Sequence, residues 1–267
     1  MTTLDTICRF LGEFAPLELA EDWDNVGLLA GDRTAEVQRV MTCLTVTPGS
    51  AGEAIERNAD MIITHHPLPF HPLKRLTTDT TAGRLLWELI GHRIAIYSPH
   101  TSFDSATEGI NEQLARGLEL DSIAPLVPLA RAGLNGGSGR FGQLAQPVPL
   151  RKLAQRLAAF LHIDHLQVVG SLDHALRRVG IACGAAGSFL EAARGAQCDA
   201  LVVGETNLHT YLEAEANGIA LLLPGHYASE RFAVAQLAAT LGAAQPRLTV
   251  WPSARETDPV QWLSWHA

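Results

Sequence analysis

Histidines and carboxylates recur in the sequence in a pattern that is typical of metal binding. Residues 94–104 read IAIYSPHTSFD, and residues 220–230 read ALLLPGHYASE. In each segment an apolar run is followed by a proline and a histidine, and a carboxylate stands four residues after that histidine. The two side chains share one face if each segment opens a helix, although a single pair of this kind is also compatible with a capping or surface role. The pairs are His100 with Asp104 and His226 with Glu230.

Two adjacent histidines, His65 and His66, follow another apolar run, residues 61–64. Successive side chains of a strand point to opposite faces, so we predict that the strand ends here. Pro67 supports this because it restricts the backbone of His66 to extended conformations. Two imidazoles that leave the sheet in this way can each serve a different ion. One of them can equally be a surface or capping residue.

The similarity between the two segments extends upstream, because residues 60–66 (DMIITHH) align without a gap on residues 199–205 (DALVVGE). We therefore predict a duplicated α/β unit whose strand ends bring a set of metal-binding side chains together. Ligands of open α/β sheets bind beyond the carboxyl ends of the strands, which is where these residues fall. The set consists of His65, His66, His100, Asp104, His226 and Glu230.

Nitrogen and oxygen donors of this kind suit Zn²⁺, Fe²⁺, Mn²⁺, Co²⁺ or Ni²⁺, and the sequence does not choose among them. The supply of donors is sufficient for two divalent ions. Two ions that share a water lower its pKa and produce hydroxide near neutral pH, so hydrolysis is the expected chemistry.

Two further pairs have alternative roles. Glu205 and His209 follow the apolar run 200–203, where they can support the site or transfer a proton to substrate, or can simply be a helix-start carboxylate and a surface histidine. Asp24 and Asn25 precede a predicted strand, and shaping a turn is the favoured role for them. Five other histidines have no strand-end partner and are expected to be structural or exposed: His71, His92, His162, His165 and His174.

Apolar runs alternate with helical patterns along the chain, which favours an α/β fold with largely parallel sheets covered by helices. We predict two repeats, residues 1–125 and 126–267, with the hinge in the proline- and glycine-rich stretch 125–142. Predicted helices include 107–118 and 229–241.

Composition excludes several classes of protein. The 267 residues are 47% hydrophobic, which is enough for a sizeable core. There are 28 acidic and 20 basic side chains, with no basic run, so nucleic-acid binding is disfavoured. The chain has no signal-like start and no run of about 18 apolar residues, which predicts a cytoplasmic protein without a membrane span. Its 4 cysteines form no CxxC pair, so a thiolate zinc site is not expected.

Six phrases, spread over nearly the whole chain, resemble the NIF-three-like family of dinuclear metal-centre proteins, whose bacterial members are often named GTP cyclohydrolase 1 type 2 homologs. They are WDNVGLLAGD, ITHHPLPF, YSPHTSFD, SGRFGQL, VVGETNLH and PGHYASE. The resemblance implies two intertwined α/β repeats that assemble into a homohexamer.

The resemblance also implies which residues bind metal. One ion takes His65 and Asp104, the other takes His66 and His226, and Glu230 bridges them. His100 is then an additional ligand or lies beside the ligands.

The resulting hypothesis is a metal-dependent hydrolase of a small polar substrate, with GTP or a related purine nucleotide as a candidate. Arg75, Arg140 and Arg231 can supply charge for its phosphates. Two alternatives stay open: a non-catalytic, metal-binding interaction or regulatory protein, and a dinuclear phosphoesterase that acts on nucleic acid. The acidic balance argues against the second of these.

Overall fold

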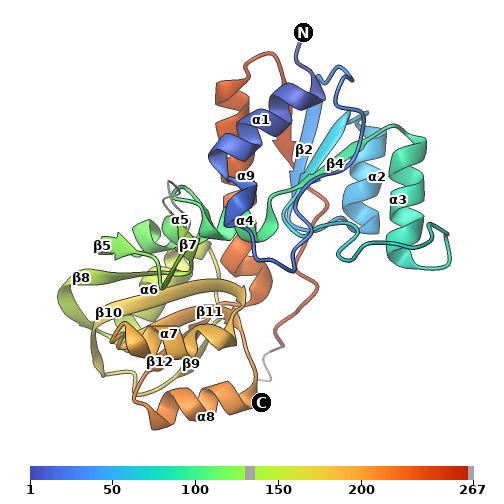
Figure 1. Cartoon of the computed structure of the whole chain (residues 1–267). Helices are drawn as coiled ribbons and strands as arrows, with labels where there is room; N and C mark the ends of the chain where they lie inside the picture. The colour runs from blue at the N-terminus through green and yellow to red at the C-terminus, as the bar shows by residue number, and fades with distance from the viewer. Residues whose placement is uncertain (130–135, 264–267) are drawn as a thin grey trace. The chain divides into compact units, whose positions relative to one another are not determined.

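The computed structural model describes residues 1–129 and 136–263. The chain folds into two compact units, each containing a sheet and helices (Figure 1). Unit 1 consists of residues 1–108 and 231–257, and unit 2 consists of residues 109–230 with the chain from Asp258 onward. The predicted sequence repeats, 1–125 and 126–267, stay a prediction, because the compact units are spatial and do not test whether the sequence is duplicated. Residues 130–135 of the predicted hinge lie outside the described residues.

Unit 1 is built on a five-stranded sheet in the order β1-β4-β3-β2-β13. The last four strands are parallel, and only β1 is antiparallel to its neighbour. Helices α1 and α9 lie on one side of this sheet, and α2 and α3 lie on the other (Figure 1). The strands are β1 (Gly27–Ala30), β2 (Arg39–Cys43), β3 (Met61–Thr64), β4 (Ala95–Ser98) and β13 (Thr249–Pro252), and the helices are α1 (Leu4–Phe14), η1 (Leu17–Leu19), α2 (Pro48–Glu56), α3 (Thr81–Gly91), α4 (His100–Ser105) and most of α9 (His226–Ala244).

The alternation of side chains along the central strands explains why both faces of this sheet are covered. Ile62 of β3 and Ile96 of β4 pack against Leu86 and Leu89 of α3. Their strand neighbours, such as Met61, point to the other face and are equally buried. Strands that are apolar on both faces need helices on both sides, which is the arrangement predicted for a parallel sheet.

Unit 2 is built on a six-stranded sheet in the order β5-β8-β10-β11-β12-β9, in which β10, β11 and β12 are parallel. The α/β class and the mixed, largely parallel sheets predicted from the sequence are therefore confirmed. The strands are β5 (Asp121–Ala124), β8 (Arg140–Pro149), β9 (Gln167–Val169), β10 (Ala175–Ala185), β11 (Ala200–Glu205) and β12 (Ala220–Leu223), beside a two-stranded pair β6 (Val127–Pro128) and β7 (Gly137–Ser138). The helices are α5 (Ile110–Gly117), α6 (Leu150–Leu161), η2 (Gly187–Phe189), α7 (Leu190–Gly195) and α8 (Leu208–Ala216).

In both units, the aspartate that precedes a central strand accepts the same pair of backbone hydrogen bonds. Asp60 Oδ2 accepts hydrogen bonds from the backbone N–H groups of Gln38 and Arg39 at 2.8 and 2.9 Å. Asp199 Oδ2 accepts the same pair of bonds from Arg177 and Arg178 at 2.7 and 2.8 Å. These carboxylates align the start of each strand with that of its neighbour, as the alignment of residues 60–66 with 199–205 leads one to expect.

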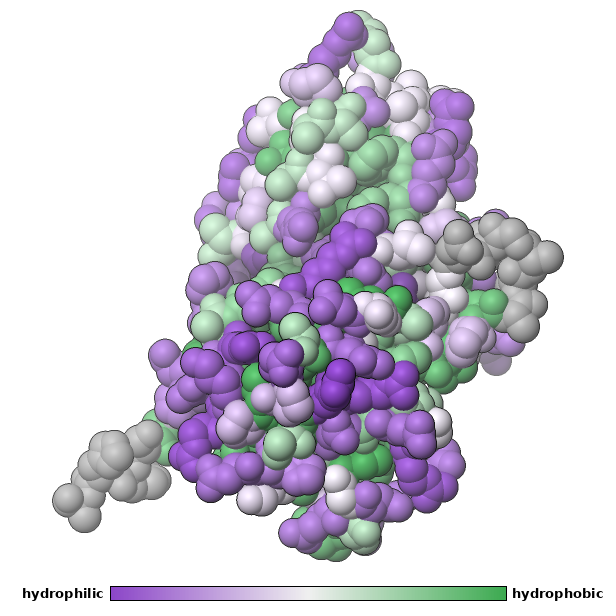
Figure 2. Space-filling model, turned by 90° about the vertical axis from the view of Figure 1, so that its left-hand side faces the viewer, coloured by the Kyte–Doolittle hydropathy of each residue, from purple (hydrophilic) through white to green (hydrophobic). Residues whose placement is uncertain are grey.

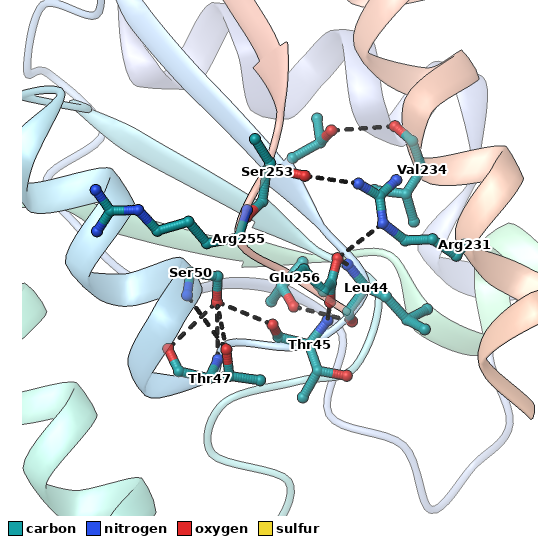
Figure 3. A network of polar contacts seen from close by, with 12 residues as sticks. Leu44, Thr45, Thr47, Ser50, Arg231, Val234, Ser253, Arg255 and Glu256 are labelled. Carbon is teal, nitrogen blue, oxygen red and sulfur yellow. Dashed lines mark hydrogen bonds and ion pairs between the residues drawn. The ribbon is translucent and has the colours of Figure 1, made fainter. Parts of the chain in front are cut away.

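Buried carboxylates hold the C-terminal part of unit 1 against β2 and α2. Glu256 accepts hydrogen bonds from the backbone N–H groups of Leu44 and Thr45 at 2.8 and 2.5 Å, and it also lies 3.0 Å from Arg231 Nε (Figure 3). Charge-assisted bonds of this kind are shorter and stronger than neutral ones. The backbone after β2 is thereby fixed from two sides.

Glu53 of α2 makes a second contact of the same kind. Its Oε2 accepts bonds from the Ser253 hydroxyl at 2.8 Å and from the backbone N–H groups of Ala254 and Arg255 at 2.9 and 3.0 Å. Burial by itself raises the pKa of Glu53, but the hydrogen bonds outweigh it and hold the pKa below its usual range. The ionised carboxylate is therefore the form that the fold needs.

The surface mixes hydrophilic and hydrophobic residues on the side that Figure 2 shows. Over residues 1–129 and 136–263, no helix combines the length and the apolar character that crossing a bilayer requires.

Candidate metal centre

Three imidazole rings of unit 1 gather where β3 and β4 end. The backbone N–H groups of His65 and His66 still bond to the carbonyls of Cys43 and Leu44, which holds both histidines just past β3. The ring centroid of His65 lies 5.2 Å from that of His66 and 5.1 Å from that of His100. One nitrogen atom from each ring lies within 4.8 Å of the others. Imidazoles that converge to this distance can share a metal ion as ligands.

The carboxylate of Asp104 joins this group because α4 begins at His100. As predicted from the four-residue spacing, His100 and Asp104 share one face of a helix, and Asp104 Oδ1 lies 3.7 Å from His65 Nε2. The backbone of His100 has a φ of 27°, which L residues rarely adopt. Strain of this kind costs about 1–3 kcal/mol and is concentrated at functional sites.

Two side chains orient the imidazoles, and sequence patterns did not identify either. The side chain of Asp24 is fully buried, and its Oδ1 lies 2.7 Å from His100 Nδ1. Its Oδ2 accepts bonds from the backbone N–H and the hydroxyl of Thr101. A hydrogen bond of 2.7 Å likewise joins Thr45 Oγ1 to His66 Nδ1. Each contact occupies Nδ1, so a metal ion would be bound through Nε2, which is how metal-binding histidines are usually held.

Asp24 was favoured as a turn residue, and the structure shows that it does more. Burial raises its pKa, but the hydrogen bonds from His100 and Thr101 outweigh that effect and lower the pKa. Asn25 has a structural contact instead, since its Nδ2 donates to the carbonyl of Pro69 at 2.8 Å.

Unit 2 places a second imidazole among carboxylates at the start of α9. His226 Nε2 lies 3.2 Å from Glu230 Oε2, and His226 Nδ1 lies 2.9 Å from Glu205 Oε1 at the end of β11. Hydrogen bonding to Glu230 and, in smaller part, to Glu205 raises the pKa of His226 to about 9, against the effect of burial. The predicted pairing of His226 with Glu230 on one helical face is present.

A glycine makes room for the Glu230 carboxylate. Gly184 of β10 has a φ of 69°, and a Cβ atom at this position would overlap Glu230 Oε1 and lie 3.4 Å from His226 Nε2. Glycine within a strand marks a close approach of another group to the backbone. A glycine within a strand is a signal that the sequence contains at Gly184. The search for histidines and acids at fixed spacing did not find this residue.

The remaining candidates are His209, Arg140 and Arg231, and Glu205 also has surroundings beyond its contact with His226. His209 is exposed on the first turn of α8. Glu205 borders a pocket of about 650 Å³, whose wall includes Thr206, Asn207 and Glu191. Arg140 is buried with its Nε 2.9 Å from Glu112, and Arg231 is held by Glu256, so both of these arginines serve their own units.

The residues present fit a divalent metal ion. The unit 1 group supplies three imidazole nitrogens and one carboxylate, and the His226 group supplies the same two kinds of donor. Such a donor set suits first-row transition metals and zinc. A mixed α/β fold with this cluster at its strand ends describes a protein that can bind metal.

Comparison with known proteins identifies the family. The chain belongs to the family described as Duf34/NIF3 (NGG1p interacting factor 3), whose model matches residues 2–259. It is 35% identical to the GTP cyclohydrolase 1 type 2 homolog of Clostridium acetobutylicum, over 84% of each chain. It is 34% identical to NIF3-like protein 1 of Drosophila melanogaster, over 85% of this chain and 78% of the fly protein.

Solved structures show the same fold. A Bacillus cereus protein related to NIF3 superposes with a TM-score of 0.88 at 22% identity, covering 98% of this chain and 99% of that chain. A hypothetical protein of Staphylococcus aureus gives a TM-score of 0.88 at 26% identity, with the same coverage.

Proposed function

We propose that the protein is a metal-dependent hydrolase that binds two divalent ions and acts on a purine nucleotide such as GTP. The ligands in this proposal are His65, His66 and Asp104 of unit 1 and His226 and Glu230 of unit 2. The observation that carries it is the convergence of three imidazoles beside Asp104 in unit 1. The nucleotide is suggested by the names of relatives, which are called GTP cyclohydrolase 1 type 2 homologs.

Several of the proposed ligands lie close in sequence to the boundaries between the units. Asp104 stands four residues before unit 1 gives way to unit 2 at Gly109. Glu230 is the last residue before Arg231, where α9 returns the chain to unit 1. Asp104, His226 and Glu230 therefore belong to the segments where the chain passes from one unit to the other.

The bound ions would supply a water of lowered pKa as the nucleophile. The chain's own residues orient the ligands and hold protons. Asp24 and Thr45 fix the Nδ1 atoms of His100 and His66, which keeps each Nε2 directed away from those contacts. Glu205 accepts the Nδ1 proton of His226 and is a candidate to pass a proton onward. In this proposal His100 is an additional ligand or proton-transfer group, and His209 is a proton-transfer candidate.

Metal content and turnover test the proposal separately. We expect about two ions per chain by elemental analysis after loading, and a clear loss in His66→Ala but not in His92→Ala, which removes an exposed histidine. Loaded protein should release formate or a ring-opened product from GTP, and Glu230→Ala should not. Full metal content in His66→Ala refutes the ligand assignment. Equal product from the wild type and Glu230→Ala refutes the substrate.

A non-catalytic role is the second candidate, and the family description, which names an interacting factor, favours it. A structural metal site is closed and its loss unfolds the protein, whereas a catalytic site keeps an open position. Chelation followed by thermal melting distinguishes the two roles. A small change in melting temperature with loss of turnover supports the hydrolase, and a collapse in melting temperature without any turnover supports the scaffold.

We further propose that the protein is a homohexamer, as the family resemblance implies. Its native mass should then be six times the 28.7 kDa of the chain. Light scattering on a gel-filtration column measures that mass, and a monomer at micromolar concentration would rule the hexamer out.

A further inference from the structure

Two large aromatic side chains are exposed beside the imidazole cluster of unit 1. Trp23 is 59% exposed and Phe70 is 45% exposed. Their ring centroids lie 5.9 Å apart, and each lies 6.0 Å from the centroid of His100. Large apolar rings are usually buried, and an exposed group of them next to a polar site marks a binding surface.

The loops that carry these rings are fixed by hydrogen bonds. Asn25, two residues after Trp23, donates to the carbonyl of Pro69, the residue before Phe70, at 2.8 Å. Asp24 is held by His100 and Thr101 on the first turn of α4. The rings are thus presented to solvent on a rigid support, which lowers the entropic cost of binding a ligand.

The same stretch of chain supplies positive charge. Lys74 and Arg75 follow Phe70 by four and five residues and are exposed. Within the described part of the chain, neither forms a salt bridge. Since Arg140 and Arg231 are each paired with a carboxylate, Lys74 and Arg75 are more available to an anionic ligand.

We propose that Trp23 and Phe70 form a stacking site for the planar ring of a heterocyclic phosphate ester, and that Lys74 and Arg75 bind its phosphate. A π-face stacks on aromatic side chains whatever the ring substituents are, and the gain is large for a small ligand. The site positions the ring next to His100. This inference rests on the proposed function for its substrate class and names the residues that recognise the substrate.

Binding of GMP, measured by calorimetry without turnover, tests the site. Trp23→Leu and Phe70→Leu should each weaken GMP binding about 5- to 150-fold. The matched control is Trp87→Leu, because Trp87 is 61% exposed on α3 and should leave the affinity unchanged. Trp23→Phe keeps an aromatic face and should retain most of the affinity for GMP. This variant provides the test at position 23 if Trp23→Leu does not fold.

The charge is tested by a ligand pair. The double variant Lys74→Gln, Arg75→Gln should bind GMP more weakly than the wild type and should bind guanosine with unchanged affinity. Ribose 5-phosphate, which lacks the ring, should bind the wild type and Trp23→Leu equally weakly. No binding of GMP to the wild type, or unchanged affinity in both leucine variants, overturns the proposal. A fall in native mass in the leucine variants also overturns it, since the rings would then be a contact between copies of the chain.

The proposed hydrolase can fail independently of this site. Metal content is measured on the same samples, and the leucine variants should keep the ions that the wild type binds. Lost GMP binding with full metal content supports stacking even if GTP is never turned over, whereas lost metal content in these variants counts against it.

Discussion

Replacement of Asp24 by asparagine tests how the imidazole cluster is held. The carboxylate accepts four bonds: from His100 Nδ1 at 2.7 Å, from the backbone N–H of Asn25 at 2.8 Å, and from the backbone N–H and hydroxyl of Thr101 at 3.1 and 2.5 Å. Asparagine has nearly the same shape but only one acceptor oxygen. Whichever way the amide is turned, one of its two faces presents a donor where an acceptor is needed.

The two orientations have different consequences. If the amide oxygen faces His100, its NH₂ group opposes the N–H of Thr101, and a buried donor is left without a partner. If the oxygen faces Thr101, the NH₂ group opposes the backbone N–H of Asn25 and requires a bare Nδ1 on His100, so the proton moves to Nε2, which can then no longer bind a metal. The first orientation costs stability, and the second costs both stability and metal affinity.

An unsatisfied buried donor costs about 1–3 kcal/mol, which lowers the melting temperature by about 2–10 °C in a chain of this size. Loss of a group that orients a ligand lowers metal affinity about 10- to 100-fold. Thermal melting of metal-free protein and competition titration with a chromogenic chelator measure the two effects. Asp164→Asn removes an exposed carboxylate and is the control. If Asp24→Asn matches this control in both assays, the orienting role assigned to Asp24 is wrong.

Three further substitutions probe other parts of the structure. Thr45→Val keeps the side-chain shape but removes the hydroxyl on His66 Nδ1, so metal affinity should fall about 10-fold with little change in melting, and an unchanged affinity would contradict the contact. Gly184→Ala introduces a Cβ that overlaps Glu230 Oε1 at a φ of 69°, so it should lower both stability, by about 1–2 kcal/mol, and metal content, and wild-type values in both would show that the close approach is absent. Glu53→Gln should lower the free energy of unfolding by about 2 kcal/mol at pH 7. The pKa of Glu53 in the folded protein lies below the unfolded value of about 4.3. The difference in free energy of unfolding between the wild type and Glu53→Gln is therefore complete above about pH 4.3 and should shrink as the pH falls through the folded pKa. A difference that does not depend on pH in denaturant titrations would contradict this prediction.

The candidate site was predictable wherever its residues follow a strand end. The apolar run before His65 became β3, and the runs before His100 and His226 became β4 and β12. The helices that pair each histidine with its carboxylate also formed, although α4 and α9 begin at the histidines themselves, and the predicted helix 107–118 begins only at Ile110. Strand ends are marked by local patterns, so one sequence suffices to find them.

Contacts between distant segments were not predictable. Asp24 meets His100 across 76 positions of sequence, and an aspartate before a strand has the same local signature whether it shapes a turn or orients a ligand. Strand β13 was missed for a related reason. Its four residues gain their place from parallel pairing with β2, some two hundred residues earlier, and no local pattern encodes that pairing.

Two histidines with different partners are oriented in a similar way in the two units. In unit 1, His100 opens a helix and its Nδ1 meets the carboxylate of Asp24. In unit 2, His226 opens a helix and its Nδ1 meets the carboxylate of Glu205. The two carboxylates come from unrelated positions, one before the edge strand β1 and the other at the end of β11. What both units share is a carboxylate on the Nδ1 atom of a histidine that opens a helix, and a contact of this kind orients metal-binding imidazoles.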